Sequence, residues 1–284
     1  MKNILEFFYQ IVLNDEINQQ GYFFYNNNLF ELKEYKRSQE EIKGLVILNN
    51  YMLINNIKIN TIILNMNNEP LSFYNNKYYV LLKIDYRNVY NNCYNSYRSP
   101  NIKELDSLKR NNWSLLWSVK VDYIEYQVSH LIHKYPILYK TVNYYIGLSE
   151  NAIMAFNMLN VHEELYISHR RLNDVFDPTE LVIDYKVRDI SEYIKNTFFY
   201  KEDSYDEIIN YIRTLRLEKM DYMLLYIRLL FPSYYFDMYY EILNGRREED
   251  ILLITSKASL YEKMLKDVYN IFKTYVNIIN ISWL

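Results

Sequence analysis

The spacing of apolar residues changes along the chain, and this change constrains the fold more than any other feature. In residues 21–36, two apolar runs flank three asparagines, which predicts a β-hairpin because asparagine tolerates the backbone of a tight turn. Residues 38–41 (Ser-Gln-Glu-Glu) form a capping-box pattern, which predicts the start of a helix. Strand patterns return at 60–66 and 77–84. The first 85 residues should therefore form a small sheet with one crossing helix.

Beyond residue 100 the apolar spacing becomes helical. Six residues recur at spacings of four, four, three, four and three, which indicates one buried helix face: Trp113, Trp117, Val121, Ile124, Val128 and Leu131. A second helix is predicted over residues 143–159, and two strand-like runs follow at 165–168 and 181–184. Helices should fill the rest of the chain, with breaks at Phe231-Pro232 and Asn244-Gly245.

These patterns predict an α+β fold with two lobes. Residues 1–85 would form a β-rich N-lobe with one helix, and residues 86–100, which lack periodicity and are dense in Asn, Ser and Tyr, would form a linker. Residues 101–284 would form a mainly helical C-lobe with a short β pair around 165–184. This order of elements is that of a bilobed protein-kinase-like fold, although folds host many functions and order alone does not assign one.

Charge and cysteine content exclude several classes of function. The chain has 32 basic and 35 acidic residues in 284, well interspersed, so no basic stripe for nucleic acid is present. The single cysteine, Cys93, excludes an internal disulfide framework and fits a reducing compartment. The first residues lack a convincing signal-peptide pattern, and no apolar window reaches the length of a membrane span. We therefore expect a protein that is cytoplasmic when made.

Residues 168–195 contain the pattern closest to phosphotransfer chemistry. In kinases, a His-x-Asp motif supplies the base that accepts the substrate hydroxyl proton, and an asparagine seven places after the histidine binds metal. Here His169 is followed two places later by Arg171, whose guanidinium cannot accept a proton. Phe176 stands in the asparagine position, and Asn173 comes too early. The sequence therefore predicts a degenerate catalytic loop with no intact base.

A candidate metal ligand survives at Asp184, directly after the apolar run 181–183. The alternative is an ion pair with Arg170, Arg171 or Arg188, and this alternative is preferred because Mg²⁺ usually needs more than one carboxylate. Asp189 is expected to cap the helix that follows or to hold the loop in place.

The predicted N-lobe offers one candidate nucleotide-binding pair. Lys33 lies on the second predicted strand, and Glu40 or Glu41 on the following helix could be its ion-pair partner. The alternative is an exposed strand lysine and a capping glutamate. Gly21 is the only glycine before this helix, so a glycine-rich phosphate loop is absent.

Six stretches in the last two thirds of the chain resemble, in consistent order, the YutH-type spore coat family. They are LWSVKVDYIEYQ, YYIGLSENAI, SHRRL, DPTELVIDYKVRDISEYI, LLFPSYYFDMYY and NIINISWL. That family is a divergent relative of the CotS-like and aminoglycoside-phosphotransferase-like kinases, whereas the first third of the chain matches it only in pattern. The resemblance implies a kinase-like fold and association with the spore coat of endospore-forming bacteria.

Together, the motifs and the resemblance give three hypotheses. The leading one is a pseudokinase that needs no cofactor and acts with other spore coat proteins in coat assembly, moving from the cytoplasm to the coat if the organism sporulates. The second is an atypical kinase of a small molecule or protein that uses ATP and Mg²⁺, with Asp184 on the metal and Asp174 or Asp177 as proton acceptor. The third is a pseudokinase that binds nucleotide only as a structural ligand.

Overall fold

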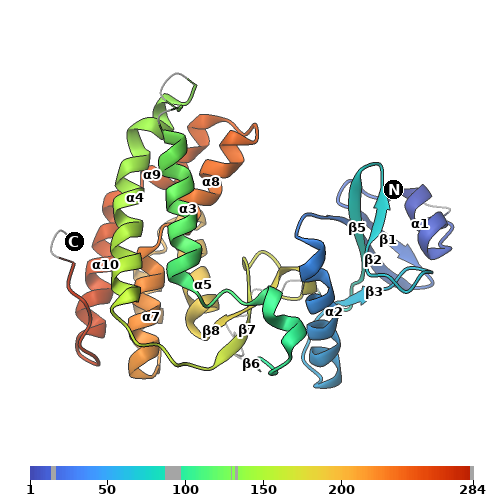
Figure 1. Ribbon diagram of the computed structural model, residues 1–284, viewed down its shortest axis with the longest axis horizontal. Coiled ribbons are helices and arrows are strands. Elements are labelled where there is room, and N and C mark those ends of the chain that lie inside the picture. The colour runs from blue at the N-terminus through green and yellow to red at the C-terminus, as the bar shows by residue number, and fades with distance from the viewer. Residues whose placement is uncertain (14–16, 87–96, 129, 132–133, 282–284) are drawn as a thin grey trace. The chain divides into compact units, whose positions relative to one another are not determined.

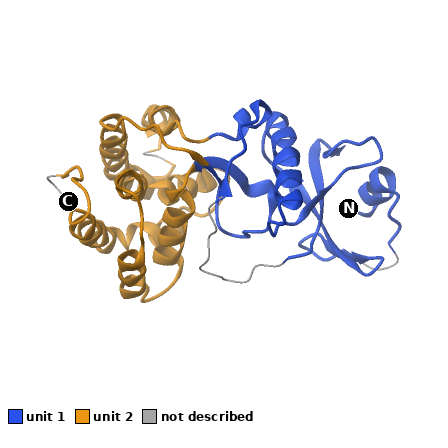
Figure 2. Ribbon diagram, turned by 90° about the horizontal axis from the view of Figure 1, so that it is seen from below, with its two compact units in different colours: residues 1–109, 166–184 blue, residues 110–165, 185–284 orange. Residues whose placement is uncertain are grey.

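The structure is a computed structural model that describes residues 1–13, 17–86, 97–128, 130–131 and 134–281. It divides into two compact units, which Figure 2 colours separately. The sheet unit consists of residues 1–109 and 166–184, and the helical unit consists of residues 110–165 and 185–284. The segment 166–184 therefore groups with the sheet unit, whereas the sequence placed it in the helical lobe. Most of the predicted linker, including Cys93, lies outside the described residues.

The sheet unit contains an antiparallel sheet of five strands. They are β1 (Tyr22–Tyr25), β2 (Asn28–Tyr35), β3 (Thr61–Ile63), β4 (Ser72–Tyr74) and β5 (Lys77–Lys83). The strand order is β1-β2-β5-β3, and β4 also pairs with β5. The predicted hairpin is confirmed: β1 pairs with β2 through a turn at Asn26 and Asn27, both with positive φ. Asn75 and Asn76 make the equivalent turn between β4 and β5.

Two helices pack on this sheet (Figure 1). The short α1 (Lys2–Tyr9) contributes Ile4 and Leu5 to a core with Phe23, Leu32 and Leu81 from the strands. The longer α2 (Gln39–Ile54) follows β2, and its predicted capping box is confirmed, with Ser38 and Glu41 satisfying each other's backbone amides. The sequence did not predict that the 3₁₀ turn η1 (Lys103–Leu108) would pack against α2.

A second, smaller sheet has the order β6-β7-β8. It is formed by β6 (Tyr97–Arg98), β7 (Leu165–His169) and β8 (Leu181–Tyr185). A 3₁₀ turn, η2 (Pro178–Glu180), leads directly into β8. A parallel bridge between Lys109 and Ile183 ties β8 to the end of the first chain segment of the sheet unit.

The helical unit is built from helices around one large core (Figure 1). They are α3 (Trp113–Val128), α4 (Pro136–Asn157), α5 (Val187–Tyr200), α6 (Tyr205–Thr214), α7 (Lys219–Leu230), α8 (Ser233–Leu243), η3 (Glu248–Ile251), α9 (Leu252–Thr255) and α10 (Ala258–Phe272). The predicted stripe on α3 is buried at Trp113, Trp117, Val121 and Ile124. Many tyrosines complete this core, and Tyr145 and Tyr235 stack with ring centroids 3.8 Å apart. Across the described residues, no helix is both long and apolar enough to cross a bilayer.

Gly21 lies just before β1, where its backbone passes close to that of β2. Its φ is +90°, its amide donates to the Asn18 carbonyl, and its carbonyl accepts from the Leu32 amide. A Cβ at this position would lie 2.3 Å from the Leu32 carbonyl oxygen. Gly21 therefore serves a close approach of two backbones within the sheet unit.

We expect Gly21→Ala to lower the thermal unfolding temperature more than Gly245→Ala does. Both glycines have positive φ, so both variants carry the left-handed backbone cost of about 1–2 kcal/mol. Only Gly21 adds a steric clash, because nothing lies within 4 Å of a Cβ at Gly245. Equal losses in the two variants would contradict this assignment.

Candidate functional site

The strand lysine of the sheet unit forms an ion pair with the segment between β7 and β8. Lys33 lies in the middle of β2, opposite Val80 of β5, and its Nζ donates to Oδ2 of Asp177. Side-chain exposure is 27% for Lys33 and 8% for Asp177. Although burial lowers the pKa of Lys33, the Asp177 carboxylate outweighs that effect, so the pKa lies above its ordinary value. The ammonium is therefore held charged and neutralised within the protein.

Asp177 is fixed on its other side by the turn that it caps. Its Oδ1 accepts hydrogen bonds from the Thr179 amide at 2.8 Å and the Thr179 hydroxyl at 2.6 Å. This makes Asp177 the N-cap of η2, with Pro178 at the first position of the turn. Each carboxylate oxygen thus has its own hydrogen-bond partner.

Two more carboxylates share this region with Lys33. Burial raises the pKa of Glu31, and the Asp177 and Asp174 carboxylates raise it further, against the lowering effect of Lys33. Burial likewise raises the pKa of Asp174, against the hydrogen bond that its Oδ1 accepts from the Phe176 amide at 2.9 Å. The single positive charge of Lys33 therefore cannot neutralise all three nearby carboxylates, those of Glu31, Asp174 and Asp177.

A second cation, Arg37, ties the start of α2 to the same segment. Its Nη1 donates to the Thr179 and Leu181 carbonyls at 2.7 and 2.8 Å. Its Nη2 also pairs with Glu41 at 3.0 Å, and its side chain is only 4% exposed. The capping role expected as the alternative is taken by Glu41, which also pairs with Arg37 just before the helix, while Lys33 meets Asp177.

The degenerate loop is held by its own backbone. His169 Nε2 lies 3.0 Å from the Val175 carbonyl, and Arg171 Nη1 donates to the Arg170 carbonyl at 2.7 Å. Phe176, in the asparagine position, packs on Tyr86 with ring centroids 5.4 Å apart. Asn173 is exposed. The loop thus folds through contacts that do not need the missing catalytic side chains.

Asp184 and Asp189 lie at the end of β8 and the beginning of the next helix. Asp184 lies inside β8, one residue before its end, and is fully buried. Asp189 lies in the first turn of α5, whose N-cap is Lys186, so Asp189 does not cap the helix. The reason is that α5 begins almost directly after β8, at Val187, three residues before the start at Ile190 that a cap at Asp189 implies. An acidic residue in a first helical turn is still favourable toward the helix dipole.

Lys33 donates to Asp177, and the Gly21 carbonyl accepts from the Leu32 amide of β2. Within the described parts of the chain, no three His, Cys, Asp or Glu residues gather where they could hold a metal ion.

Sequence reasoning missed the roles of Asp177 and Arg37. For Asp177 a signal was present, because Asp-Pro-Thr-Glu has the cap, first-position proline and acidic residue of a helical turn start. For Arg37 no local signal exists, since its carbonyl partners lie more than 140 residues away in the chain.

The arrangement of the elements is that of phosphotransferases with a kinase-like fold. An aminoglycoside phosphotransferase from Alicyclobacillus acidocaldarius superimposes with a TM-score of 0.56, covering 92% of this chain and 94% of that chain at 10% identity. A spectinomycin phosphotransferase in complex with ADP and spectinomycin gives 0.54, covering 96% of each chain at 12% identity. At such identities the similarity shows the fold alone, and it confirms the predicted α+β kinase-like class.

The chain belongs to the YutH family of spore coat proteins. Residues 2–272 match the family described as "Spore coat putative kinase YutH", which confirms the resemblance seen in the sequence. The endospore coat-associated protein YutH of Bacillus subtilis (strain 168) is 25% identical over 206 residues, which are 61% of this chain. The chain spans 61% of the length of that relative.

We expect the Lys33–Asp177 pair to contribute more to stability than an exposed pair on the same sheet. In a double-mutant cycle of Lys33→Met and Asp177→Asn, the coupling free energy from urea unfolding should be about 1–3 kcal/mol, because both groups are largely removed from water. Lys77 and Glu34, exposed and 2.8 Å apart, form the control pair, for which the coupling should be clearly smaller because water screens it. Equal couplings would show that the Lys33 pair is no more than a surface contact.

We also expect Glu31→Gln to stabilise the protein at neutral pH. The pKa of Glu31 is raised, so its contribution to stability is fully present below its ordinary value of 4.5 and is lost as the pH rises through the raised value. The difference in unfolding temperature between variant and wild type should therefore grow from pH 4.5 to pH 7. The control is Glu34→Gln, which should show the opposite sign because Lys77 lowers the pKa of Glu34. A pH-independent difference for Glu31→Gln would contradict the expectation.

Proposed function

We propose that this chain is a spore coat-associated protein whose kinase-like fold acts in coat assembly or as an interaction module, without transferring phosphate. The family description and the name of the Bacillus subtilis relative support the association with the coat. On this proposal the protein is cytoplasmic when made, joins other spore coat proteins later, and needs neither ATP nor Mg²⁺.

The observation that carries the proposal is the Lys33–Asp177 ion pair. In active kinases a strand lysine contacts the nucleotide phosphates and is positioned by a glutamate on the following helix. Here Glu41 on that helix forms an ion pair with Arg37. Lys33 forms its ion pair with Asp177, whose carboxylate also accepts a hydrogen bond from the Thr179 amide. Releasing Lys33 for a phosphate would leave Asp177 buried without its cation, which is costly.

The loop supports the same conclusion. Arg171 occupies the position of the catalytic base and donates a hydrogen bond to a backbone carbonyl, so it has neither the chemistry nor the freedom to accept a proton. Phe176 stands where a metal-binding asparagine is needed and packs on Tyr86. The residues that replace the catalytic groups therefore contribute to the folded loop.

A second candidate function is phosphotransfer with a rearranged site, in which Asp174 accepts the proton and Asp184 binds Mg²⁺. One observation favours Asp174 over Asp177 in that role: its pKa is raised by burial, and a raised carboxylate pKa is closer to the range suited to proton transfer at neutral pH. Asp177 is less suited because both of its oxygens are engaged.

Thermal unfolding with ATP and Mg²⁺ distinguishes these functions. A ligand present at about one hundred times its Kd stabilises the native state by about 2.7 kcal/mol, which raises the unfolding temperature by several degrees. We expect no such rise for the wild type and no phosphate release above that of buffer. An aminoglycoside phosphotransferase of the same fold, measured alongside, provides the positive control.

The Asp184→Ala and Asp174→Asn variants show which other function holds if nucleotide binding or phosphate transfer is observed. Stabilisation by ATP and Mg²⁺ that disappears in Asp184→Ala would overturn the proposal in favour of a nucleotide-binding protein. Phosphate transfer that is lost in Asp174→Asn, with the fold intact by circular dichroism, would establish the second candidate.

A further inference from the structure

Helix α3 has two apolar faces, of which one is buried in the core of the helical unit and the other is largely exposed. The inner face buries Trp113, Trp117, Val121 and Ile124. The opposite face exposes five large apolar side chains: Leu115 at 58%, Leu116 at 42%, Val119 at 60%, Tyr123 at 49% and Tyr126 at 75%. At 3.6 residues per turn these five fall within an arc of about 100°, the width of the apolar stripe by which a helix packs on another.

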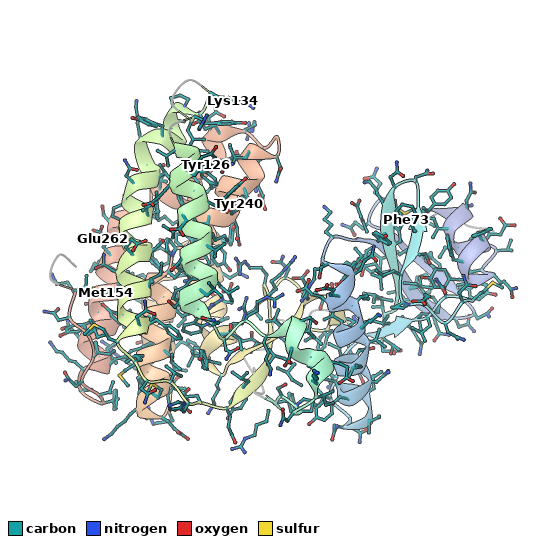
Figure 3. All side chains as sticks on the ribbon, in the orientation of Figure 1. Phe73, Tyr126, Lys134, Met154, Tyr240 and Glu262 are labelled. Carbon is teal, nitrogen blue, oxygen red and sulfur yellow. The ribbon has the colours of Figure 1, made fainter. Side chains whose placement is uncertain are left out.

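The exposed apolar side chains of this outer face lie next to one another along the helix, whereas exposed apolar residues on most surfaces are scattered singly. A helix that is apolar on all sides is ordinarily buried, and a contiguous exposed apolar patch marks a contact site. The patch continues onto α8, because the Tyr123 ring stacks on Tyr240 with centroids 6.2 Å apart. Figure 3 labels Tyr126 on α3 and Tyr240 on α8. We call the five residues and Tyr240 the α3 surface.

The edge of the α3 surface next to α4 is acidic. Asp122 and Glu125 are exposed on α3, and Glu150 is exposed on α4. Burial raises the pKa of Glu150, and the carboxylates of Glu125 and Asp122 raise it further, so the three groups lie close enough to repel one another.

The opposite edge carries little net charge. Lys120 lies there with its Nζ 5.2 Å from the Tyr240 ring centroid and 3.6 Å from Asp237. The surface thus combines one apolar stripe with one negative edge.

We propose that the α3 surface binds a single amphipathic helix of a partner protein that carries Lys or Arg along one side of its apolar face. Anchors at spacings of three and four on such a helix match the stripe, and its basic side would meet Asp122, Glu125 and Glu150. A second copy of this chain is a poorer occupant, because it would bring an acidic edge of its own. An anionic membrane is poorer for the same reason.

This inference deepens the proposed function by naming an interaction surface and the chemistry of its partner. Binding at α3 needs neither Lys33 nor the 168–184 segment, since α3 belongs to the helical unit. Its failure would therefore leave the nucleotide experiment unaffected, and the reverse is also true.

The test uses two designed helical peptides of about 18 residues with the same leucine stripe, one flanked by lysines and one by glutamates. Fluorescence anisotropy with the full chain should show the basic peptide binding roughly tenfold or more tightly than the acidic one. Val119→Glu should weaken the basic peptide by roughly tenfold or more. Leu260→Glu, at an exposed apolar position of α10, is the matched control and should leave binding unchanged.

Reversing the charge of the acidic edge tests whether that edge selects the basic peptide. The double variant Glu125→Lys with Glu150→Lys should reverse the preference between the two peptides, with circular dichroism and the unfolding temperature confirming the fold. Equal binding of both peptides, or binding that Val119→Glu does not weaken, would overturn the proposal. So would a wild-type dimer that Val119→Glu dissociates in light scattering, because the occupant would then be a second copy.

Discussion

The sheet unit depends on two cations near the beginning of the chain that bind a segment far along it. Lys33 and Arg37 reach Asp177 and the carbonyls of Thr179 and Leu181, across sequence separations of 144 and 142 residues. These bonds add to the Phe176–Tyr86 ring contact and the hydrogen bond from the Asn60 amide to the Phe176 carbonyl in holding the turn between β7 and β8. Lys33, the residue that the sequence offered for phosphate binding, thus takes part in an internal contact that joins distant parts of the chain.

Local patterns predicted the elements well, because each arises from neighbouring residues. The asparagine turns, the Ser38–Glu41 capping box and the buried stripe on α3 need no information from elsewhere in the chain. The grouping of 166–184 with the first 109 residues could not be predicted in this way, since it depends on Arg37, Lys33 and the bridge at Lys109. The kinase-like class was predictable because the order of elements and the family motifs indicate it together.

The candidate site was predicted less well, for a physical reason. In the sequence, partners were assigned to the site residues by analogy with active kinases. Lys33 pairs with Asp177 and not with a glutamate of the following helix, and Glu41 pairs with Arg37, which lies just before that helix. Asp184 lies inside β8 and is fully buried. Charge pairing is decided by which groups share a buried space, and sequence spacing constrains that only within a helix or a turn.

The sheet unit is discontinuous in sequence, and this has a consequence for synthesis. Its first part ends at residue 109, and its second part begins only after 56 residues of the helical unit, from 110 to 165. Domains usually fold as their chains emerge from the ribosome, N-terminal parts first. This unit cannot be completed until residue 184 has emerged, so until then Lys33 lacks Asp177 and Arg37 lacks the Thr179 and Leu181 carbonyls. The helices α3 and α4 are made during that interval, and the loop that contains them must close for the last segment to reach the strands.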